Sequence, residues 1–247
     1  MCNFALVLTK TEAIVLHAFK YGESKLIIDL FTREHGRLSC IASIPKSGKG
    51  KLKKPLFQPL ALIEVDCDLR PNVQLQKLRE ARMAYPLTGI PFDAVKLSIA
   101  LFVAEFLYHA LRGEQQNVQM FDYISHSIRW LDGTGDGVAN FHLTFLMRLS
   151  RFLGFYPNLD SYESGAYFDL RESVFCQYPP LHRDFLDPQE AERMGTLMRM
   201  DFATMHLFRM NRTERNRCLD VMLTYYRLHI PAFPELKSLA VLQELFA

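Results

Sequence analysis

The first third of the chain alternates short apolar runs with clusters of turn residues, and this pattern constrains the fold most strongly. The runs are rich in β-branched and aromatic residues, and Gly, Pro, Asn and Asp stand between them, which is typical of strands joined by tight turns. Strands are predicted at residues 12–18, 25–32, 37–44, 60–65 and 73–78. Five short strands favour a small closed barrel over a sandwich, which needs about seven strands.

The rest of the chain has the periodicity of helices. From residue 93 onward, apolar residues recur at intervals of three and four, as in amphipathic helices. Helices are predicted at residues 93–112, 118–131, 138–153, 188–200, 213–229 and 238–246, with Thr213 as an N-cap, and residues 158–186 are expected to be irregular. The sequence therefore predicts an α+β protein in which a five-stranded barrel, residues 1–85, precedes an all-α helical domain, residues 86–247.

The distribution of charge supports the same division. Residues 1–85 contain 14 Lys and Arg against 8 Asp and Glu, whereas residues 86–247 contain 15 against 19. The first part therefore has a balance of +6 and the second a balance of −4. A basic barrel followed by an acidic helical domain suggests two different roles, and the barrel is the candidate for binding a polyanion.

Cysteine usage and the N-terminal residues predict a soluble, cytoplasmic protein. The five cysteines are an odd number, widely spaced and without a CxxC pair, so they predict reduced thiols rather than disulfides. The N-terminus lacks the basic and apolar regions of a signal peptide. Lys96, Glu105 and His109 interrupt the most apolar long stretch, residues 94–111, which we therefore interpret as a buried core helix rather than a membrane span.

No motif in the sequence predicts catalysis or a metal site. The segment from Lys46 to Lys51 superficially resembles a phosphate-binding loop, but it lacks the first glycine of that motif and has Leu52 where a Ser or Thr would bind magnesium. The sequence contains neither GxSxG nor HExxH. Cys176 and His182 lack a neighbouring cysteine that could complete a set of four metal ligands. We therefore expect a non-catalytic protein without a metal cofactor.

A segment dense in lysine, after the third predicted strand, is the strongest functional signal. Its lysines are spaced by Ser and Gly, so they can follow a phosphate backbone: Lys46, Lys49, Lys51, Lys53 and Lys54. Loops of small barrels commonly bind single-stranded nucleic acid. The competing interpretation is a solvated hairpin tip whose lysines serve solubility. In that case the candidate DNA surface is the barrel face around Lys20, Tyr21, Lys25 and Arg37, where Tyr21 is the best candidate to stack on a base.

The order of several short motifs along nearly the whole chain resembles the bacterial RecO family of recombination mediators and DNA repair proteins. In the first part these motifs are Tyr21-Gly22-Glu23-Ser24, Leu30-Phe31-Thr32, Gly36-Arg37, the lysine segment and Leu56-Phe57-Gln58-Pro59-Leu60. In the second part the apolar helix at residues 141–153 is followed by Gly154-Phe155-Tyr156-Pro157-Asn158-Leu159. The resemblance implies an N-terminal OB-fold barrel and a C-terminal helical domain.

The resemblance also implies a function without bond-making catalysis. RecO proteins bind single- and double-stranded DNA, anneal complementary strands and act in the cytoplasm, at the nucleoid, with RecR and, in many bacteria, RecF. They engage the single-stranded DNA-binding protein, SSB, and help to load RecA onto coated strands. Some members have a four-cysteine zinc site in the helical domain, but only Cys176 lies in that region here, so zinc is not expected. Packing of aromatic side chains is expected to hold that region instead, through Tyr162, Tyr167, Phe168, Phe175 and Tyr178.

Arginines of the helical domain are candidates for binding a protein partner. Arg148 and Arg151 lie on the apolar helix at residues 138–153, whereas Arg212 and Arg215 lie before or at the start of a later helix. Either pair could bind the acidic tail of SSB, which ends in a hydrophobic residue, and the later arginines could instead extend the DNA track. The alternative is a solvated basic face. For the protein as a whole, an RNA-binding barrel and a scaffold for an acidic protein tail stay open beside DNA binding.

Overall fold

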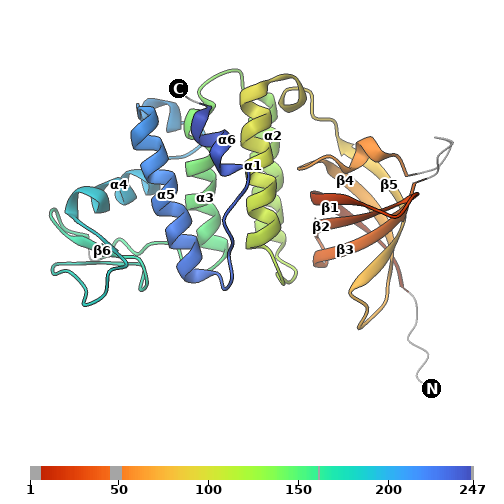
Figure 1. The fold of residues 1–247 in the computed structure, drawn as a ribbon, viewed down its shortest axis with the longest axis horizontal. Coiled ribbons are helices and arrows are strands. Elements are labelled where there is room, and N and C mark those ends of the chain that lie inside the picture. The colour runs from red at the N-terminus through yellow and green to blue at the C-terminus, as the bar shows by residue number, and fades with distance from the viewer. Residues whose placement is uncertain (1–6, 45–51, 161, 246–247) are drawn as a thin grey trace. The chain divides into compact units, whose positions relative to one another are not determined.

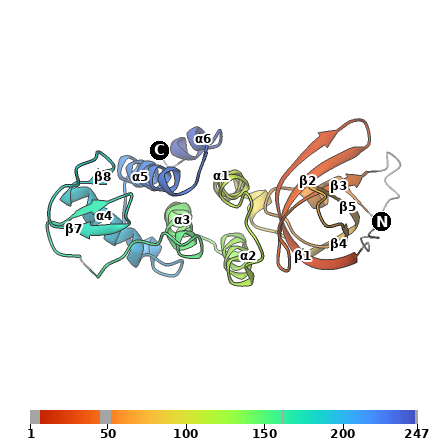
Figure 2. The ribbon, with the colours of Figure 1, turned by 90° about the horizontal axis from the view of Figure 1, so that it is seen from below.

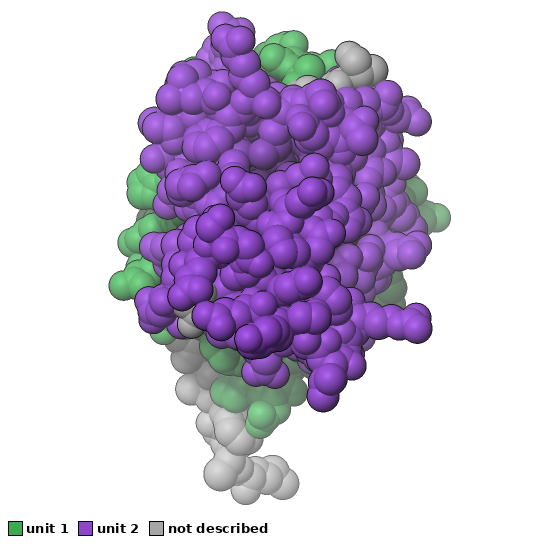
Figure 3. All heavy atoms as spheres, turned by 90° about the vertical axis from the view of Figure 1, so that its left-hand side faces the viewer, with its two compact units in different colours: residues 1–133 green, residues 134–247 purple. Residues whose placement is uncertain are grey.

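The computed structural model describes residues 7–44, 52–160 and 162–245, and Figure 1 shows their elements along the chain. Contacts divide the chain into two units, residues 1–133 and residues 134–247, which Figure 3 shows in different colours. The first unit contains the predicted barrel together with the two helices that follow it. The predicted division at residue 85 marks the change from strands to helices, and as a boundary between domains it stays a prediction.

The predicted five-stranded barrel is confirmed, and it has the OB-like arrangement. In chain order its strands are β1 (Val7–Tyr21), β2 (Lys25–Thr32), β3 (Gly36–Ser43), β4 (Leu62–Leu69) and β5 (Leu75–Tyr85). Neighbouring strands follow the order β1-β2-β3-β5-β4, and β1 pairs with β4 to close the barrel (Figure 2). A short 3-10 helix, η1 (Lys54–Phe57), precedes β4.

β1 is long because it takes part in both sides of the barrel. Its first half pairs with β4 and its second half with β2, and a bulge interrupts the second pairing between Val15 and His17. Bulges bend a strand and increase its twist, so β1 can turn from one side of the barrel to the other. The remaining junction is short and parallel: β3 meets β5 only where residues 39–41 pair with residues 75–77.

Two helices pack against the barrel within the first unit. They are α1 (Ala94–Ala110) and α2 (Val118–Gly133), and both were predicted from the sequence. Arg33, just after β2, forms an ion pair with Asp122 of α2. Gly36 lies so close to the loop between the helices that a Cβ atom would be 2.5 Å from its backbone, and its φ of +66° also favours glycine. The barrel and this helix pair therefore form one packed unit.

A buried carboxylate at the end of α2, Asp132, fixes the segment that leads from the barrel to α1. Its oxygens accept hydrogen bonds from the backbone N–H groups of Thr88 (3.0 Å), Gly89 (2.8 Å) and Ile90 (2.8 Å). The buried ammonium group of Lys96 donates to the backbone carbonyl of Asp132 at 3.0 Å. A Cβ atom at Gly89 would lie 2.0 Å from that carbonyl oxygen, so only glycine fits. Buried charges are stable only with partners of this kind.

The second unit is mostly helical, as predicted, but it is not all-α. Its helices are η3 (Val138–Asn140), α3 (Phe141–Phe152), α4 (Pro188–Arg199), η4 (Met205–Leu207), α5 (Arg212–His229) and α6 (Leu239–Glu244). The segment expected to be irregular contains a three-stranded sheet of order β7-β6-β8, formed by β6 (Tyr167–Asp169), β7 (Val174–Cys176) and β8 (Phe185–Leu186). Across the described residues, no helix is long and apolar enough to cross a membrane.

Two local predictions for the second unit are wrong. Asn211 caps α5 instead of Thr213, because its side chain accepts a hydrogen bond from the backbone N–H of Glu214 and the Glu214 carboxylate accepts one in return. Phe168 and Phe175 are buried, as the expected aromatic packing requires, but Tyr178 is 78% exposed and does not contribute to it.

His142 on α3 makes the stability of the second unit depend on pH. Complete burial, together with the nearby charge of Arg215, lowers the pKa of His142 to about 3. The pKa of an unperturbed histidine is about 6.5, so the unfolded chain binds the extra proton across that interval. Stability therefore falls as the pH falls below about 6.5. We expect this group alone to cost up to about 1.4 kcal/mol for each pH unit between about 6 and 4.

The substitution His142→Gln tests this expectation because glutamine does not titrate. Urea unfolding followed by circular dichroism at pH 7 and pH 5 should show a smaller acid loss in the variant than in the parent chain. An equal loss in both proteins would show that other groups cause the acid sensitivity.

Candidate nucleic-acid interface

The outer face of β1 has a row of exposed rings. Successive side chains of a strand point to opposite faces, so His17, Phe19 and Tyr21 share one face, and we call these three residues the aromatic stripe. Phe19 is 41% exposed, Tyr21 is 54% exposed, and His17 is also exposed. The rings of His17 and Phe19 have centroids 5.6 Å apart. Barrels that bind single strands stack successive bases on exposed rings of this kind.

The aromatic stripe borders an apolar surface that crosses four strands. Ile27 of β2 pairs with Phe19 of β1 on one side and with Ile41 of β3 on the other. Ile41 in turn pairs with Lys77 of β5. Paired residues lie on the same face of a sheet, and here both isoleucines are half-buried while Lys77 is exposed. The outer face therefore has an apolar centre with aromatic rings at one edge and an ammonium group at the other.

The basic residues of the first unit differ in whether they have an acidic partner. Several cations are paired: Lys10 and Arg82 with Glu64, Arg33 with Glu12 and Asp122, Arg37 with Asp29, and Arg79 with Asp68. Five exposed lysines have no ion-pair partner among the described residues, namely Lys20, Lys25, Lys53, Lys54 and Lys77. An ammonium group without an acidic neighbour can neutralise a phosphate without first losing an ion pair.

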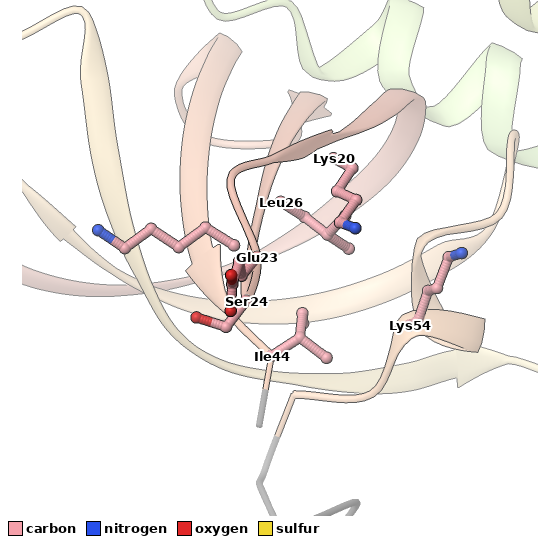
Figure 4. A pocket seen from close by; sticks show the side chains of 7 residues that line it. Lys20, Glu23, Ser24, Leu26, Ile44 and Lys54 are labelled. Atoms are coloured by element: carbon pink, nitrogen blue, oxygen red, sulfur yellow. The ribbon is translucent and has the colours of Figure 1, made fainter. Parts of the chain in front are cut away.

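A hollow beside the β1–β2 turn brings three of these lysines together. It has a volume of about 280 Å³ and is lined by Lys20, Glu23, Ser24, Lys25, Leu26, Ile44 and Lys54 (Figure 4). A second cavity of about 240 Å³ shares Lys20, Leu26 and Lys54 with it. Figure 4 shows that Lys20 and Lys54 come from different segments, Lys20 from β1 and Lys54 from the start of η1. The structure therefore places Lys54 of the lysine segment next to two lysines of the predicted barrel face.

The lysine segment is described only in part. Lys53 and Lys54 are exposed at the start of η1, and neither has an ion-pair partner within the described ranges. Lys46, Lys49 and Lys51 lie outside the described residues. The predicted contact of the whole segment with phosphates therefore stays a prediction.

Arg37, predicted for the DNA surface, is engaged in contacts within the first unit. Its guanidinium group forms an ion pair with Asp29 at 3.3 Å, donates to the backbone carbonyl of Tyr108 at 3.0 Å, and lies 4.7 Å from the centre of the Tyr108 ring. Burial lowers the pKa of Arg37, and the charge of Asp29 opposes this change. Since these contacts join β3 to α1, we do not include Arg37 in the candidate interface.

Two of the arginines predicted for partner binding have structural contacts in the second unit. Arg148 donates from Nε and Nη2 to the backbone carbonyl of Met200, at 3.1 and 2.9 Å. Arg215 is buried and donates to Oδ1 of Asn140 at 3.1 Å. Both guanidinium groups stabilise the unit through these hydrogen bonds. Fewer of their N–H donors are therefore free to bind a partner.

The other two predicted arginines are exposed. The guanidinium group of Arg151 lies 4.4 Å from the centre of the Tyr156 ring, and Arg212 donates to the backbone carbonyl of Gln243 at 2.9 Å. Their exposed positions leave room for an acidic ligand, so they are the better candidates of the four.

Cys176 and His182, the pair considered as metal ligands in the sequence, both have other contacts in the structure. Cys176 Sγ donates to the backbone carbonyl of Tyr167 at 3.9 Å, and His182 Nε2 lies 3.2 Å from a carboxylate oxygen of Asp169. Burial raises the pKa of the Cys176 thiol, which disfavours the thiolate that metals bind. Within the described ranges, no three His, Cys, Asp or Glu side chains are grouped so that they could hold a metal ion. The absence of zinc stays a prediction that metal analysis of the purified protein would test.

Phe19, His17 and Lys77 are the parts of the interface that the sequence analysis missed. The segment from His17 to Tyr21 reads His-Ala-Phe-Lys-Tyr, with a ring at every second position. Because the side chains of a strand alternate between faces, this spacing alone could have identified the aromatic stripe. Lys77 could not be assigned from the sequence, since its neighbours on β3 depend on the parallel pairing of β3 and β5.

Comparisons with known proteins match both parts of the chain. Family models described as "Recombination protein O N terminal" and "Recombination protein O C terminal" match residues 6–87 and 91–240. A "DNA repair protein RecO" of Phocaeicola vulgatus is 53% identical over 241 residues, which cover 98% of this chain and 100% of the relative. The protein of the same description in Bacteroides fragilis is 54% identical and that in Porphyromonas gingivalis 36%; the matches cover 97% and 96% of this chain, and 100% and 98% of those relatives.

Proposed function

The chain belongs to the RecO family of DNA repair proteins, and on this premise we propose that it is a recombination mediator whose barrel binds single-stranded DNA on the outer face of β1, β2, β3 and β5. One observation supports this assignment above all. The aromatic stripe meets three of the lysines without acidic partners, Lys20, Lys25 and Lys54, beside the β1–β2 turn, where Tyr21 is paired with Lys25. Rings bind bases and ammonium groups bind phosphates, and a single strand presents both.

The proposed mechanism is non-covalent. Bases stack on Phe19 and Tyr21 while phosphates contact Lys25 and Lys77. Neutralisation of phosphates by the lysines lowers the repulsion between two strands, so the same charges favour binding of double-stranded DNA and annealing of complementary strands. No bond is made or broken in these steps, and the protein acts as a mediator rather than an enzyme.

Membership of the family supports a set of protein partners. We assign to the chain the partners RecR and SSB, with RecF and RecA as further ones, and a role in loading RecA onto SSB-coated DNA. Arg151 and Arg212 are the proposed contacts for the acidic tail of SSB, because both are exposed. The proposed location is the cytoplasm, at the nucleoid.

Replacement of the five lysines of the lysine segment by alanine should flatten the salt dependence of DNA binding. Each phosphate of a single strand that is neutralised contributes about −0.7 to the slope of log affinity against log salt. If three or four of these lysines bind phosphates at once, the slope should become less steep by roughly 2 to 3. The loss should be similar for all base sequences, since lysine contacts to phosphates carry no sequence information. Fluorescence anisotropy at several salt concentrations measures this slope.

The matched control is the double variant Lys10→Ala with Arg82→Ala. Both residues are paired with Glu64, so their removal should change the slope much less. A five-alanine variant that keeps the parent slope would exclude the lysine segment as a phosphate-binding loop. The same titration with single-stranded RNA distinguishes DNA binding from the RNA-binding alternative.

A further inference from the structure

We propose that the hollow beside the β1–β2 turn binds one nucleotide, with the base on an apolar floor and the phosphate between Lys20 and Lys54. The proposal rests on the proposed function, in that a DNA strand bound to the outer face supplies the nucleotide. A free nucleotide has the same chemistry, and the experiment below separates the two sources.

The floor of the hollow continues into the core of the barrel. Leu26 and Phe57 are buried members of that core, and Ala18 and Ile44 are half-buried against it. Leu26 lines both cavities, and Phe57 and Ala18 line the second. The hollow thus lies where β1 ends and β2 begins, and it offers a concave apolar surface at the end of a barrel. Ligand sites are common at the mouths of barrels and bind rings on apolar walls.

Apart from the Glu23 carboxylate, which also lines the hollow and repels a phosphate, the polar groups of the hollow suit the other parts of a nucleotide. Lys20 and Lys54 are exposed, line the hollow from different segments and have no ion-pair partner among the residues described (Figure 4). An ammonium group on a flexible stem can follow a phosphate as a mobile point charge. Ser24 of the hollow and Gln58 of the second cavity add a hydroxyl and an amide group that can pair with the polar edge of a base.

The position of the hollow relative to the aromatic stripe indicates how a DNA strand would reach the hollow. Tyr21 ends the stripe, and the next residues, Glu23 and Ser24, line the hollow. A strand whose base stacks on Tyr21 therefore enters the hollow by passing over the β1–β2 turn. A base inside a duplex is paired and stacked and must first be extruded at a cost of a few kcal/mol. The hollow thus favours single strands over duplexes.

Methyl NMR on the full-length chain tests the proposal, because isoleucine and leucine methyl groups mark both surfaces. Leu26 and Ile44, the hollow pair, report on the hollow, whereas Ile27 and Ile41, the outer pair, report on the outer face. The probes are a short thymidine oligonucleotide, thymidine 5′-monophosphate and deoxyribose 5-phosphate. We expect the oligonucleotide to shift the signals of both pairs, and the sugar phosphate without a base to leave the hollow pair unchanged.

Each outcome decides one part of the proposal. Shifts of the hollow pair with the mononucleotide alone would support a nucleotide site whose natural ligand is a free nucleotide. Shifts of the outer pair alone with the oligonucleotide would overturn the inference and leave the proposed function intact. If the oligonucleotide shifts no methyl signal, the proposed function itself fails. Equal shifts of the hollow pair with the sugar phosphate and the mononucleotide would overturn the role of the base.

A pair of charge variants gives an independent measure. Lys20→Gln combined with Lys54→Gln should weaken binding of the oligonucleotide about tenfold at moderate salt, because two phosphate contacts are lost. Lys10→Gln combined with Arg82→Gln is the matched control, since both residues are exposed, are paired with Glu64 and do not line the hollow. We expect less than a twofold effect from the control. If each positive charge removed weakens oligonucleotide binding equally in both variants, the overall positive potential of the barrel causes the loss. That result would contradict a defined phosphate position.

Discussion

Replacing Phe19 and Tyr21 together by alanine is expected to weaken the binding of single-stranded DNA by about 30-fold or more. Stacking of one base on one ring contributes about 1–3 kcal/mol, so two rings contribute at least about 2 kcal/mol. Both rings are substantially exposed, and their truncation should therefore cost little stability. Fluorescence anisotropy with an unstructured oligonucleotide at a single salt concentration measures the loss. The salt slope should stay unchanged, because no cation is removed.

The control for this variant is Phe92→Ala. Phe92 belongs to the 3-10 helix η2 (Ile90–Phe92), is 87% exposed and is not part of the outer face of the barrel. We expect it to leave DNA affinity unchanged, and Tyr21→Phe should retain most of it because the ring remains. An affinity of the double variant within twofold of the parent would rule out stacking on the aromatic stripe.

Asp132→Ala is expected to lower the free energy of unfolding of the first unit by about 3–5 kcal/mol. The substitution leaves three backbone N–H groups without their acceptor, on the segment that joins the barrel to α1. The buried Lys96 also loses the nearby negative charge. Trp130, the single tryptophan of the chain, lies on α2 two residues away, so its fluorescence during urea unfolding reports on this unit.

Two further variants show whether the loss comes from the carboxylate. Asp132→Asn keeps one acceptor oxygen and should lose less than the alanine variant. Asp136→Ala removes an exposed acidic residue nearby and should change the midpoint very little. If Asp132→Ala unfolds at the same urea concentration as the parent chain, Asp132 does not stabilise the segment that joins the barrel to α1.

The elements that the sequence predicted best are those whose pattern extends over many residues. β2 spans the predicted residues 25–32, and α4 begins at the predicted Pro188. β5 continues to Tyr85, beyond the predicted residue 78, because its later residues include exposed arginines that ended the apolar run. The strands of the small sheet have two or three residues each, which is too short for an alternating pattern to be recognised.

The candidate interface was harder to predict because charge alone does not reveal ion pairing. Arg37 and Lys25 each carry one positive charge, but the fold places Asp29 beside Arg37 and gives Lys25 no ion-pair partner among the described residues. Arg215 likewise becomes buried against Asn140, although its position near the start of a helix made it a candidate for partner binding. Such differences follow from contacts between residues far apart in the chain, which no local pattern encodes.

The parallel junction between β3 and β5 lets a ligand reinforce the closure of the barrel. Only three positions pair there, against eight between β1 and β4. Proteins open locally where the fewest hydrogen bonds hold a segment. Ile41 and Lys77 are paired across this junction, so the outer face is complete only while the barrel is closed. Anything that binds the complete face adds its binding free energy to closure by mass action. A barrel with DNA bound across that junction would thus open less often than the DNA-free barrel. It would therefore also be cleaved more slowly by a protease.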